Sequence, residues 1–348
     1  MMSEAKKYFF EVRSAQEVLE YMRFLPKDAI IFIDVDDTLI TPISKTFHGT
    51  LSREMIDEIK EDKLKYPNYA EIISNWRLQR KAMILDQDWP KVIREFRKEF
   101  RVYALTKLDS GHFGNIESME KWRYSELKSF GLEFTSDLQE ENINGASFYK
   151  GIFMTGPNSK GKTLQNFLEY LSASMMVLVD DNVDYINDVA SFCYDHSIDF
   201  IGILFRGLEQ LKGRPDPRVV KIQREYLIKH AKWLEDDEAI KKIKKADISI
   251  DKNLFIIILK YHASLEKIDD CRPAHLEFLD RYYERGIFVV SGRQIPLTGG
   301  VIIAKNTIRL ELENIMDQDP FMVENLATYD IYEFTPNKFS DSFKEILK

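Results

Sequence analysis

The sequence predicts an α/β protein, with a doubly wound parallel sheet followed by a smaller α+β domain. Apolar runs of strand length alternate with helical segments from residue 8 to about 205, as in a parallel sheet with helical crossovers. From residue 252 the expected order becomes strand, helix, strand, strand, helix, strand. The chain has 348 residues, more than one core usually supports. We therefore expect one domain over residues 1–248 and a second over 252–348.

The elements of the first domain follow from apolar spacing and flanking residues. Val18, Leu19, Met22 and Leu25 lie at helical spacing after Ser14. Residues 42–90 hold polar helical patterns without a strand of core type, which predicts a small helical cap. The expected strands are 8–12, 30–33, 101–106, 147–155, 175–180 and 200–205, and the expected helices are 53–64, 69–85, 89–99, 115–130, 164–171, 185–192, 216–231 and 235–245.

Three aspartates directly follow the apolar run of residues 30–33. Asp34 and Asp36 would emerge at the carboxyl end of a buried parallel strand, where α/β sheets bind ligands. Two carboxylates at i and i+2 on an extended backbone point the same way, and a hard divalent ion such as Mg²⁺ relieves their repulsion. An acidic turn after a strand is the simpler alternative. We interpret the segment as a cation site, with Asp37 at its margin.

The run Asp34-Val35-Asp36-Asp37-Thr38 resembles the first motif of the haloacid dehalogenase (HAD) superfamily, in particular its functionally uncharacterised, acid-phosphatase-leaning members. The resemblance covers roughly residues 8–240 and is loose outside four motifs. It implies that Asp34 is a nucleophile and Asp36 a general acid/base, acting through an aspartyl-phosphate on a small phosphomonoester. It also implies that residues 42–90 form the cap that chooses the substrate.

The other motifs of that superfamily have counterparts further along the chain. Thr106 ends an apolar strand and would hold a phosphate oxygen. Lys160 or Lys162 would supply the cation, and the pair Lys160-Gly161 favours Lys160. Asp180 and Asp181 end another apolar run and would complete the Mg²⁺ ligands together with Asp34 and Asp36.

A second interpretation competes for the same lysines. Residues 156–163, Gly-Pro-Asn-Ser-Lys-Gly-Lys-Thr, match the P-loop pattern of nucleotide hydrolases. In that case Lys162 would reach the phosphates, Thr163 would bind Mg²⁺ and Asp180 would complete the site. Only 18 residues separate Lys162 from Asp180, which is tight for most P-loop folds. That interpretation also leaves Asp34 and Asp36 unexplained, so the phosphatase is preferred.

Aromatic and basic residues in the cap are candidates for substrate contact. They are Phe47, His48, Trp76, Arg77 and Arg80. Packing between cap helices is the simpler interpretation of Trp76.

The second domain has the ferredoxin-like βαββαβ order. The expected strands are 254–259, 287–291, 300–305 and 328–335, and the expected helices are 272–285 and 310–317. Over nearly all of residues 252–339 the chain resembles YciI-like (YCII-related) domains, on the segments 272–276, 291–292, 298–300, 317–321 and 329–334.

The YciI-like resemblance implies an active-site pair, His275 with Asp319, in which the carboxylate orients the imidazole. The alternative is that Asp319 belongs to a turn and His275 to a helix start. Such domains dimerise through their sheets, so a homodimer is expected. A third interpretation is a binding or regulatory protein whose role lies in this domain.

Composition bounds the class of protein. A net charge of −8 with no broad basic run argues against a nucleic-acid partner or an anionic membrane surface. The basic run at 241–245 follows four acids and is interpreted as a solvated helix face. Two distant cysteines indicate neither a disulfide framework nor a zinc site. These features, with no long apolar segment, lead us to expect a cytoplasmic protein.

Overall fold

The structure, a computed structural model, describes residues 6–22, 25–48, 50–211, 215–245, 253–338, 340 and 343. The chain divides into two compact units. One unit comprises Met1–Lys212 with Glu225–Trp233, and the other comprises Gly213–Arg224 with Leu234–Lys348. Among the described residues no helix is long and apolar enough to cross a membrane.

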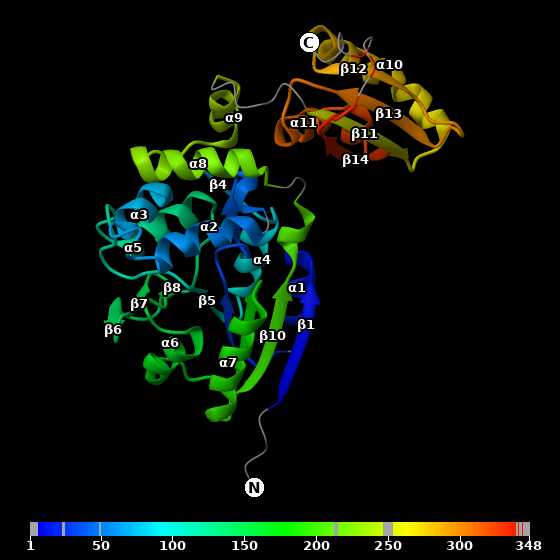
Figure 1. Cartoon of the computed structure of the whole chain (residues 1–348). Helices are drawn as coiled ribbons and strands as arrows, with labels where there is room; N and C mark the ends of the chain where they lie inside the picture. Colours follow the sequence, from blue (N-terminus) through cyan, green and yellow to red (C-terminus); the bar gives the residue numbers. More distant parts are fainter. Residues whose placement is uncertain are drawn as a thin grey trace. The chain divides into compact units, whose positions relative to one another are not determined.

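The first unit contains an eight-stranded sheet within the described residues, in the order β1-β10-β9-β2-β5-β8-β7-β6 (Figure 1). The pairs from β1 to β8 are parallel, and β7 and β6 add an antiparallel edge. The strands are β1 Lys7–Val12, β2 Ile30–Ile33, β5 Arg101–Thr106, β6 Glu141–Ile143, β7 Ala146–Tyr149, β8 Ile152–Met154, β9 Met175–Asp180 and β10 Asp199–Phe205. Strand β2 is therefore central, and its four residues are buried on both faces of the sheet.

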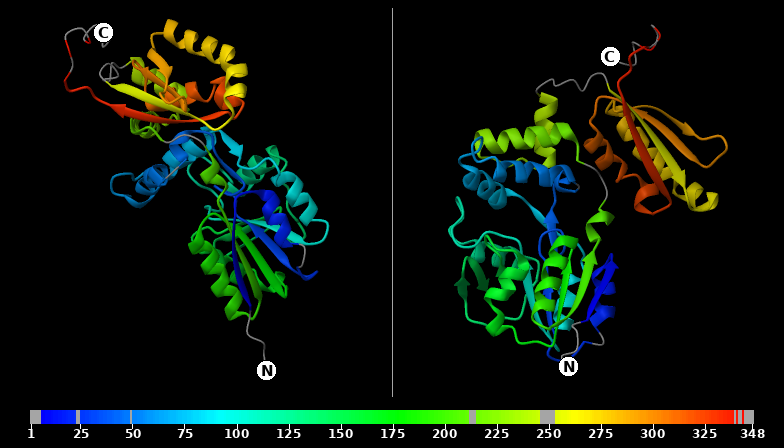
Figure 2. Two further views of the ribbon diagram at one scale, coloured as in Figure 1. Left: turned by 90° about the vertical axis from the view of Figure 1, so that its right-hand side faces the viewer. Right: turned by 60° about the horizontal axis from the view of Figure 1, so that its bottom comes forward.

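A hydrophobic core lies on each face of this sheet, and Figure 2 shows helices on both sides of its strands. Helices α1 (Ala15–Tyr21), α4 (Trp89–Phe96) and α5 (Met119–Ser129) contribute to one core. Helices α6 (Lys160–Asn166) and α7 (Val183–Asp195) contribute to the other. The expectation of an α/β unit with a large, mainly parallel sheet is confirmed.

The segment expected to be a small helical cap without a strand of core type contains two short strands. Helices α2 (Thr50–Glu61) and α3 (Tyr69–Gln79) are present, but β3 (Ile40–Pro42) and β4 (Ala82–Ile84) pair antiparallel beside them. The helix expected over 69–85 ends at Gln79 because Arg80 takes an extended conformation and leads into β4. A 3₁₀ turn, Lys45–Phe47, follows β3.

The strand expected over 147–155 is a hairpin. Strands β7 and β8 are antiparallel and are joined by Lys150 and Gly151, both with positive φ (46° and 87°). Asn144 and Gly145, at φ 53° and 84°, join β6 to β7 in the same way. Backbone of this kind matches the twist of hairpin strands. The remaining elements before the second sheet are two short 3₁₀ turns and two helices. They are Leu168–Tyr170, Gly207–Gln210, α8 (Pro217–His230) and α9 (Asp236–Lys245).

The second unit contains the expected βαββαβ order, and its four-stranded sheet, β12-β13-β11-β14, is antiparallel throughout. The elements are β11 Leu254–Tyr261, α10 Leu265–Glu284, β12 Phe288–Arg293, β13 Gly299–Ala304, α11 Arg309–Met316, α12 Pro320–Val323 and β14 Ala327–Phe334. Helix α10 begins at Leu265, earlier than the expected Arg272, with Pro273 inside it. Its apolar face packs with one face of the sheet.

Candidate functional site

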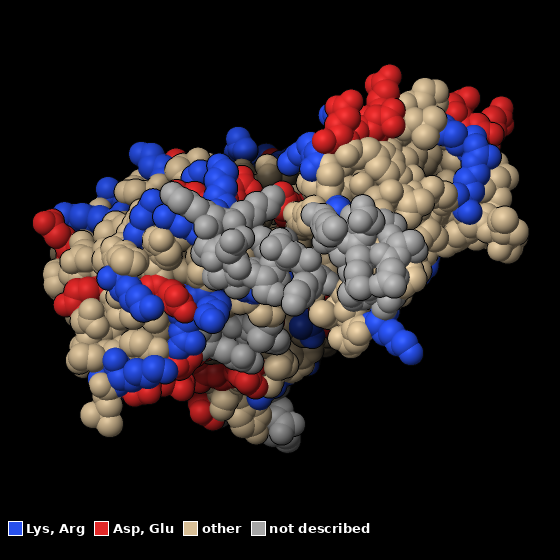
Figure 3. Space-filling view, turned by 45° about the horizontal axis from the view of Figure 1, so that its top comes forward, with Lys and Arg blue, Asp and Glu red and all other residues tan. Residues whose placement is uncertain are grey.

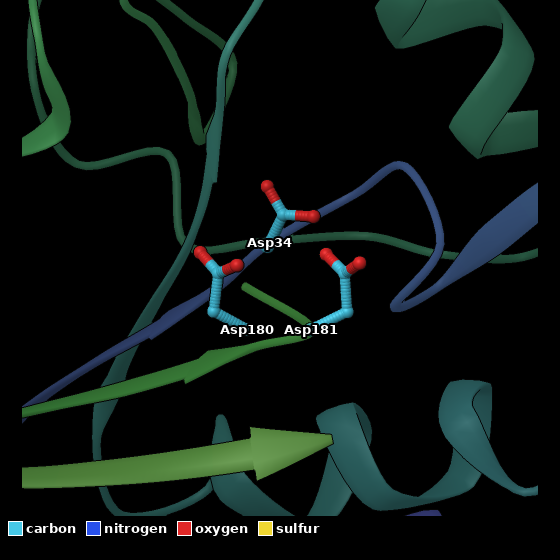
Figure 4. Close-up of side chains that lie close together, drawn as sticks. All are labelled: Asp34, Asp180 and Asp181. Carbon is cyan, nitrogen blue, oxygen red and sulfur yellow. The ribbon is translucent and has the colours of Figure 1, made fainter. Parts of the chain in front are cut away.

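Three carboxylates meet at the ends of two neighbouring strands. Asp34 follows β2, Asp180 ends β9 and Asp181 comes next, while β2 and β9 run parallel with Ile33 opposite Val179. The backbone N–H of Asp34 donates to Val179 at 2.8 Å. One oxygen from each carboxylate lies within 4.8 Å of the others, and Figure 4 shows the three groups side by side. Asp34 and Asp180 are buried, and Asp181 is partly exposed.

Lys160 inserts its ammonium group into this cluster. Its Nζ donates to Asp180 at 2.6 Å and also to Asp34, and the side chain is fully buried. Burial lowers the pKa of Lys160, but Asp180 and Asp34 outweigh burial and raise it above its ordinary value. Burial, together with Asp180 and Asp181, raises the pKa of Asp34 well above its ordinary value although Lys160 opposes this. Lys160 thus contacts two of the three carboxylates of this cluster.

Thr106 ends β5, the strand on the other side of β2. Its side chain is buried, and its Oγ1 has no hydrogen-bond partner among the described residues. Buried hydroxyls nearly always have a partner, so an unsatisfied one at the ligand-binding edge of a parallel sheet indicates a place for a ligand oxygen.

Asp36 does not join the carboxylate cluster. Arg123 donates to its Oδ2 at 2.6 Å, and Arg80 lies 3.8 Å from its Oδ1. Glu126 accepts from Arg123 at 2.7 Å and from Arg80 at 3.3 Å, which closes a ring of alternating charges. Burial raises the pKa of Asp36, but the two guanidinium groups outweigh burial and hold it below its ordinary value. The arginines hold this carboxylate in the structure, and its expected role as a metal ligand stays a prediction.

The P-loop segment is arranged differently from a phosphate cradle. The backbone N–H of Gly161 donates to Asp188 at 2.7 Å, and that of Lys162 donates to Ser159 at 3.2 Å. The Thr163 hydroxyl donates to the Ser159 carbonyl at 2.8 Å, and the Lys162 side chain is exposed. These donors are already used within the protein, so Lys160 is the lysine that the fold brings to the acids.

The C-terminal pair is formed. His275 on α10 and Asp319 before α12 meet through Nδ1 and Oδ1 at 2.8 Å. Asp319 is fully buried and also accepts from the backbone N–H of Phe321 at 3.0 Å, so it caps α12 as well as holding the imidazole. The imidazole stacks on Phe321, with centroids 4.1 Å apart. Asp319 Oδ2 has no partner among the described residues.

The family of unknown function DUF2608 matches residues 11–240, which is most of the first unit and more than half of the chain. The chain belongs to the DUF2608 family. A second match covers residues 254–335 and identifies a YCII-related domain there. The expected YciI-like domain is thereby confirmed, and the first unit carries a family description that states no activity.

Two relatives of this DUF2608 protein come from Rickettsia. An uncharacterized protein of Rickettsia prowazekii (strain Madrid E) is 25% identical over 232 residues, which is 63% of this chain and 84% of that protein. Another, from Rickettsia bellii (strain RML369-C), is 22% identical over 221 residues, 57% of this chain and 75% of that protein.

A solved structure, that of 5-chloro-2-hydroxyhydroquinone dehydrochlorinase from Burkholderia phenoliruptrix AC1100 in complex with 2,5-dihydroxybenzoquinone, is 22% identical to the DUF2608 protein. The match covers 24% of this chain and 93% of that chain, with a TM-score of 0.22.

Sequence reasoning missed part of the site of this DUF2608 protein. A pocket beside Asp36 is lined by the expected Phe47, Trp76, Arg77 and Arg80, and also by Lys60, Lys107, Trp122 and Arg123. The adjacent aromatic and basic residues Trp122-Arg123 on helix α5 were the available signal. On the face seen in Figure 3, basic and acidic side chains are interspersed.

Proposed function

We propose that the DUF2608 unit is a Mg²⁺-dependent phosphomonoester hydrolase of the HAD type that works through an aspartyl-phosphate. The observation that supports this most strongly is the buried Lys160 bridging Asp34 and Asp180 at the ends of adjacent parallel strands. A nucleophilic carboxylate, a cation for the phosphoryl oxygens and further acids for a metal are then side by side. The four motifs of the sequence come together at one edge of one sheet.

The donor set fits Mg²⁺. Asp34, Asp180 and Asp181 bring one carboxylate oxygen each within 4.8 Å of one another, and a hard divalent cation prefers oxygen ligands of this kind. When bound, Mg²⁺ would supply neutralisation of the phosphoryl charge. Burial raises the pKa of Asp34 because the charged carboxylate is poorly solvated there. A bound cation would stabilise that charged form.

The first step uses Asp34 and Asp36. A carboxylate oxygen of Asp34 attacks phosphorus while the bond from phosphorus to the ester oxygen breaks. The leaving oxygen takes that electron pair and receives a proton from Asp36, which must first take up that proton from solvent because Arg123 and Arg80 lower its pKa. Lys160 and the unsatisfied hydroxyl of Thr106 hold the phosphoryl oxygens.

The second step regenerates the carboxylate. Asp36, now ionised, accepts a proton from water, and the water oxygen attacks the phosphorus of the aspartyl-phosphate. The bond from phosphorus to the Asp34 oxygen breaks, and phosphate leaves. Arg123 and Arg80 fix the side chain of Asp36 during both steps through the contacts at 2.6 and 3.8 Å.

Phosphate release from a panel of phosphomonoesters, with ATP and GTP included, tests the proposal. Wild type should release phosphate only with Mg²⁺, and Asp34→Asn should lose at least about a thousandfold in kcat because the nucleophile is removed. Lys162→Met is the matched control and should keep wild-type rates, since Lys162 is exposed. Hydrolysis confined to nucleotides, lost in Lys162→Met and kept in Asp34→Asn, would favour the P-loop enzyme instead.

A second candidate function lies in the YCII-related domain. The His275–Asp319 contact at 2.8 Å beside the ring of Phe321 supports a small-molecule site with the imidazole as a base. Binding of a metabolite lost in His275→Ala, together with an absence of phosphatase turnover in the wild type, would place the role of the protein in this domain. We also propose that this domain makes the protein a homodimer.

A further inference from the structure

A pocket of about 150 Å³ lies beside Asp36 in the first unit. Its walls come from the loop after β2 and from helices α2, α3 and α5, with Lys60 on α2, Trp76 and Arg77 on α3 and Arg123 on α5. Because Asp36 is the proposed acid that protonates the leaving oxygen, the pocket lies where the leaving group of a substrate would extend.

Five cationic and three acidic side chains line the pocket, and two of the cations, Lys60 and Lys107, have no ion-pair partner among the described residues. Lys107 donates to the backbone carbonyls of Asn158 and Gly156 instead. Arg77 pairs with Asp109 at 2.9 Å, and Arg80 and Arg123 share Glu126 and Asp36. Lys60 is partly buried and has no ion-pair partner among the described residues. Burial and the nearby Arg77 lower its pKa, as expected of a cation without a bound anion.

Several N–H donors of the same lining residues are unused. Nε and Nη1 of Arg80, Nε of Arg123 and Nε1 of Trp76 are buried without an acceptor among the described residues. The Cζ atom of Arg80 lies over the ring of Trp76, 5.1 Å from its centroid, which is a cation–π distance. Unsatisfied buried donors destabilise a fold, so a ligand whose oxygens accept hydrogen bonds from them would bind favourably.

We propose that this pocket binds the leaving group of the substrate and that this leaving group carries a second anionic group, a carboxylate or a phosphate, held by Lys60 and Arg80. The proposal rests on the proposed hydrolase function. A neutral acceptor would satisfy the donors of Arg80 but would leave the charge of Lys60 uncompensated. The substrate is thus an anion at both ends, with one phosphate at Asp34 and one acidic group between the cap helices.

Matched substrate pairs test this. Phosphoglycolate with ethyl phosphate forms the carboxylate arm, and ethylene glycol bisphosphate with its monophosphate forms the phosphate arm. The first member of each pair carries the second anionic group. In at least one pair we expect kcat/KM of the full-length wild type with Mg²⁺ to be at least about tenfold higher for that member, which is the effect of one charge-assisted hydrogen bond. In Lys60→Met that ratio should fall close to one, while the exposed Lys63→Met should keep it.

The outcomes separate the two proposals. Mg²⁺-dependent hydrolysis with equal kcat/KM within both pairs overturns the second-anion pocket and leaves the hydrolase standing. A preference that survives in Lys60→Met also overturns it, because the selecting charge then lies elsewhere. Hydrolysis of no member of either pair, and of no other phosphomonoester, removes the hydrolase and this inference with it. Arg80→Gln adds a second readout. If this variant loses the preference for the substrate with the second anionic group because KM for that substrate rises while kcat stays, Arg80 binds the leaving group.

Discussion

At the scale of single residues, Lys160 and Lys162 show how position on a helix decides chemistry. Lys160, Thr163 and Leu164 are buried, whereas Lys162 and Gln165 are exposed. Residues at i, i+3 and i+4 share one face of a helix, so Lys160 lies on the same face as Leu164. That spacing was present in the sequence and distinguishes the two lysines better than motif resemblance does.

Removing the ammonium group should expose the repulsion among the acids. In Lys160→Met we expect the free energy of unfolding of the first unit to fall by about 3–5 kcal/mol without Mg²⁺, the usual cost of leaving buried charges unpaired. Saturating Mg²⁺ should recover part of this loss because the ion binds only the folded cluster. Urea unfolding followed by Trp fluorescence, with EDTA or Mg²⁺, measures both values.

Lys162→Met is the control and should unfold like wild type under both conditions. A deficit in Lys160→Met that is unchanged by Mg²⁺ would count against a cation site at Asp34, Asp180 and Asp181.

Glu120 gives a prediction on pH. It accepts from the backbone N–H of Gly111 at 2.7 Å and from the hydroxyls of Ser147 and Ser118, both at 2.9 Å. Burial raises its pKa, but these bonds outweigh burial and hold the pKa below the ordinary 4.5. A carboxylate with a lowered pKa stabilises the fold above its ordinary pKa, and this stabilisation is lost as pH falls through the folded value.

Glu120→Gln should therefore cost about 1–2 kcal/mol at pH 7, and the difference from wild type should shrink below pH 4.5. Unfolding by urea at several pH values measures it, with the exposed Glu117→Gln as control. A difference that stays constant down to about pH 3 would show that the charge of Glu120 contributes nothing.

At the scale of elements, the sequence predicted the buried strands best. The strands at 30–33, 101–106 and 175–180 have the expected bounds, because long apolar runs buried on both faces have few alternatives. The hairpin at 146–154 was not predicted, since its turn places Lys150 at a positive φ that side chains rarely adopt. The Asn144-Gly145 turn did carry a known signal that was overlooked.

Gly156 lies between strand β8 and helix α6, which carries Lys160. Two features require glycine at this position. Its φ is +55°, and an added Cβ would lie 2.1 Å from the carbonyl oxygen of Gly145. Gly131 has a similar φ of +70° with nothing within 4 Å of a Cβ. Gly131→Ala should cost about 1–2 kcal/mol from backbone strain alone, and Gly156→Ala at least about 1–3 kcal/mol more from overpacking.

Thermal unfolding of the two variants, referred to wild type, gives this comparison. Equal losses would mean that the loop around Gly145 moves aside without cost. Reduced phosphatase activity in Gly156→Ala but not in Gly131→Ala would further connect this turn to the placement of Lys160.

At the scale of the whole molecule, the acid cluster and the pocket differ in how far sequence could predict them. Asp34, Asp180 and Asp181 end strands of one parallel sheet, so topology alone brings them to one edge. The pocket joins Asp36, Lys60, Arg80 and Arg123, which come from separate segments. Their meeting depends on how the cap helices pack, and no local pattern encodes that.

The sheet of the second unit has one face outside the hydrophobic core. In the second unit Phe255, Ile257 and Leu259 of β11 pack into the core, while Ile256 and Ile258 face the other side of the sheet and are only partly buried. Tyr332 on β14, opposite Ile256, is 54% exposed. The same face carries the Lys260–Asp330 ion pair beside these apolar side chains. Covering its apolar part is favourable, so the full-length protein should be a dimer through this face.

Light scattering during size exclusion should give twice the monomer mass for wild type. Ile256→Lys with Tyr332→Glu should give monomers at the same concentration, because a dimer with two-fold symmetry places each new charge twice within the buried surface. Glu277→Lys changes an exposed charge on helix α10 and should leave the dimer intact. A wild-type monomer would remove the assembly proposal, and a dimer that persists in the double variant would move the interface to another surface.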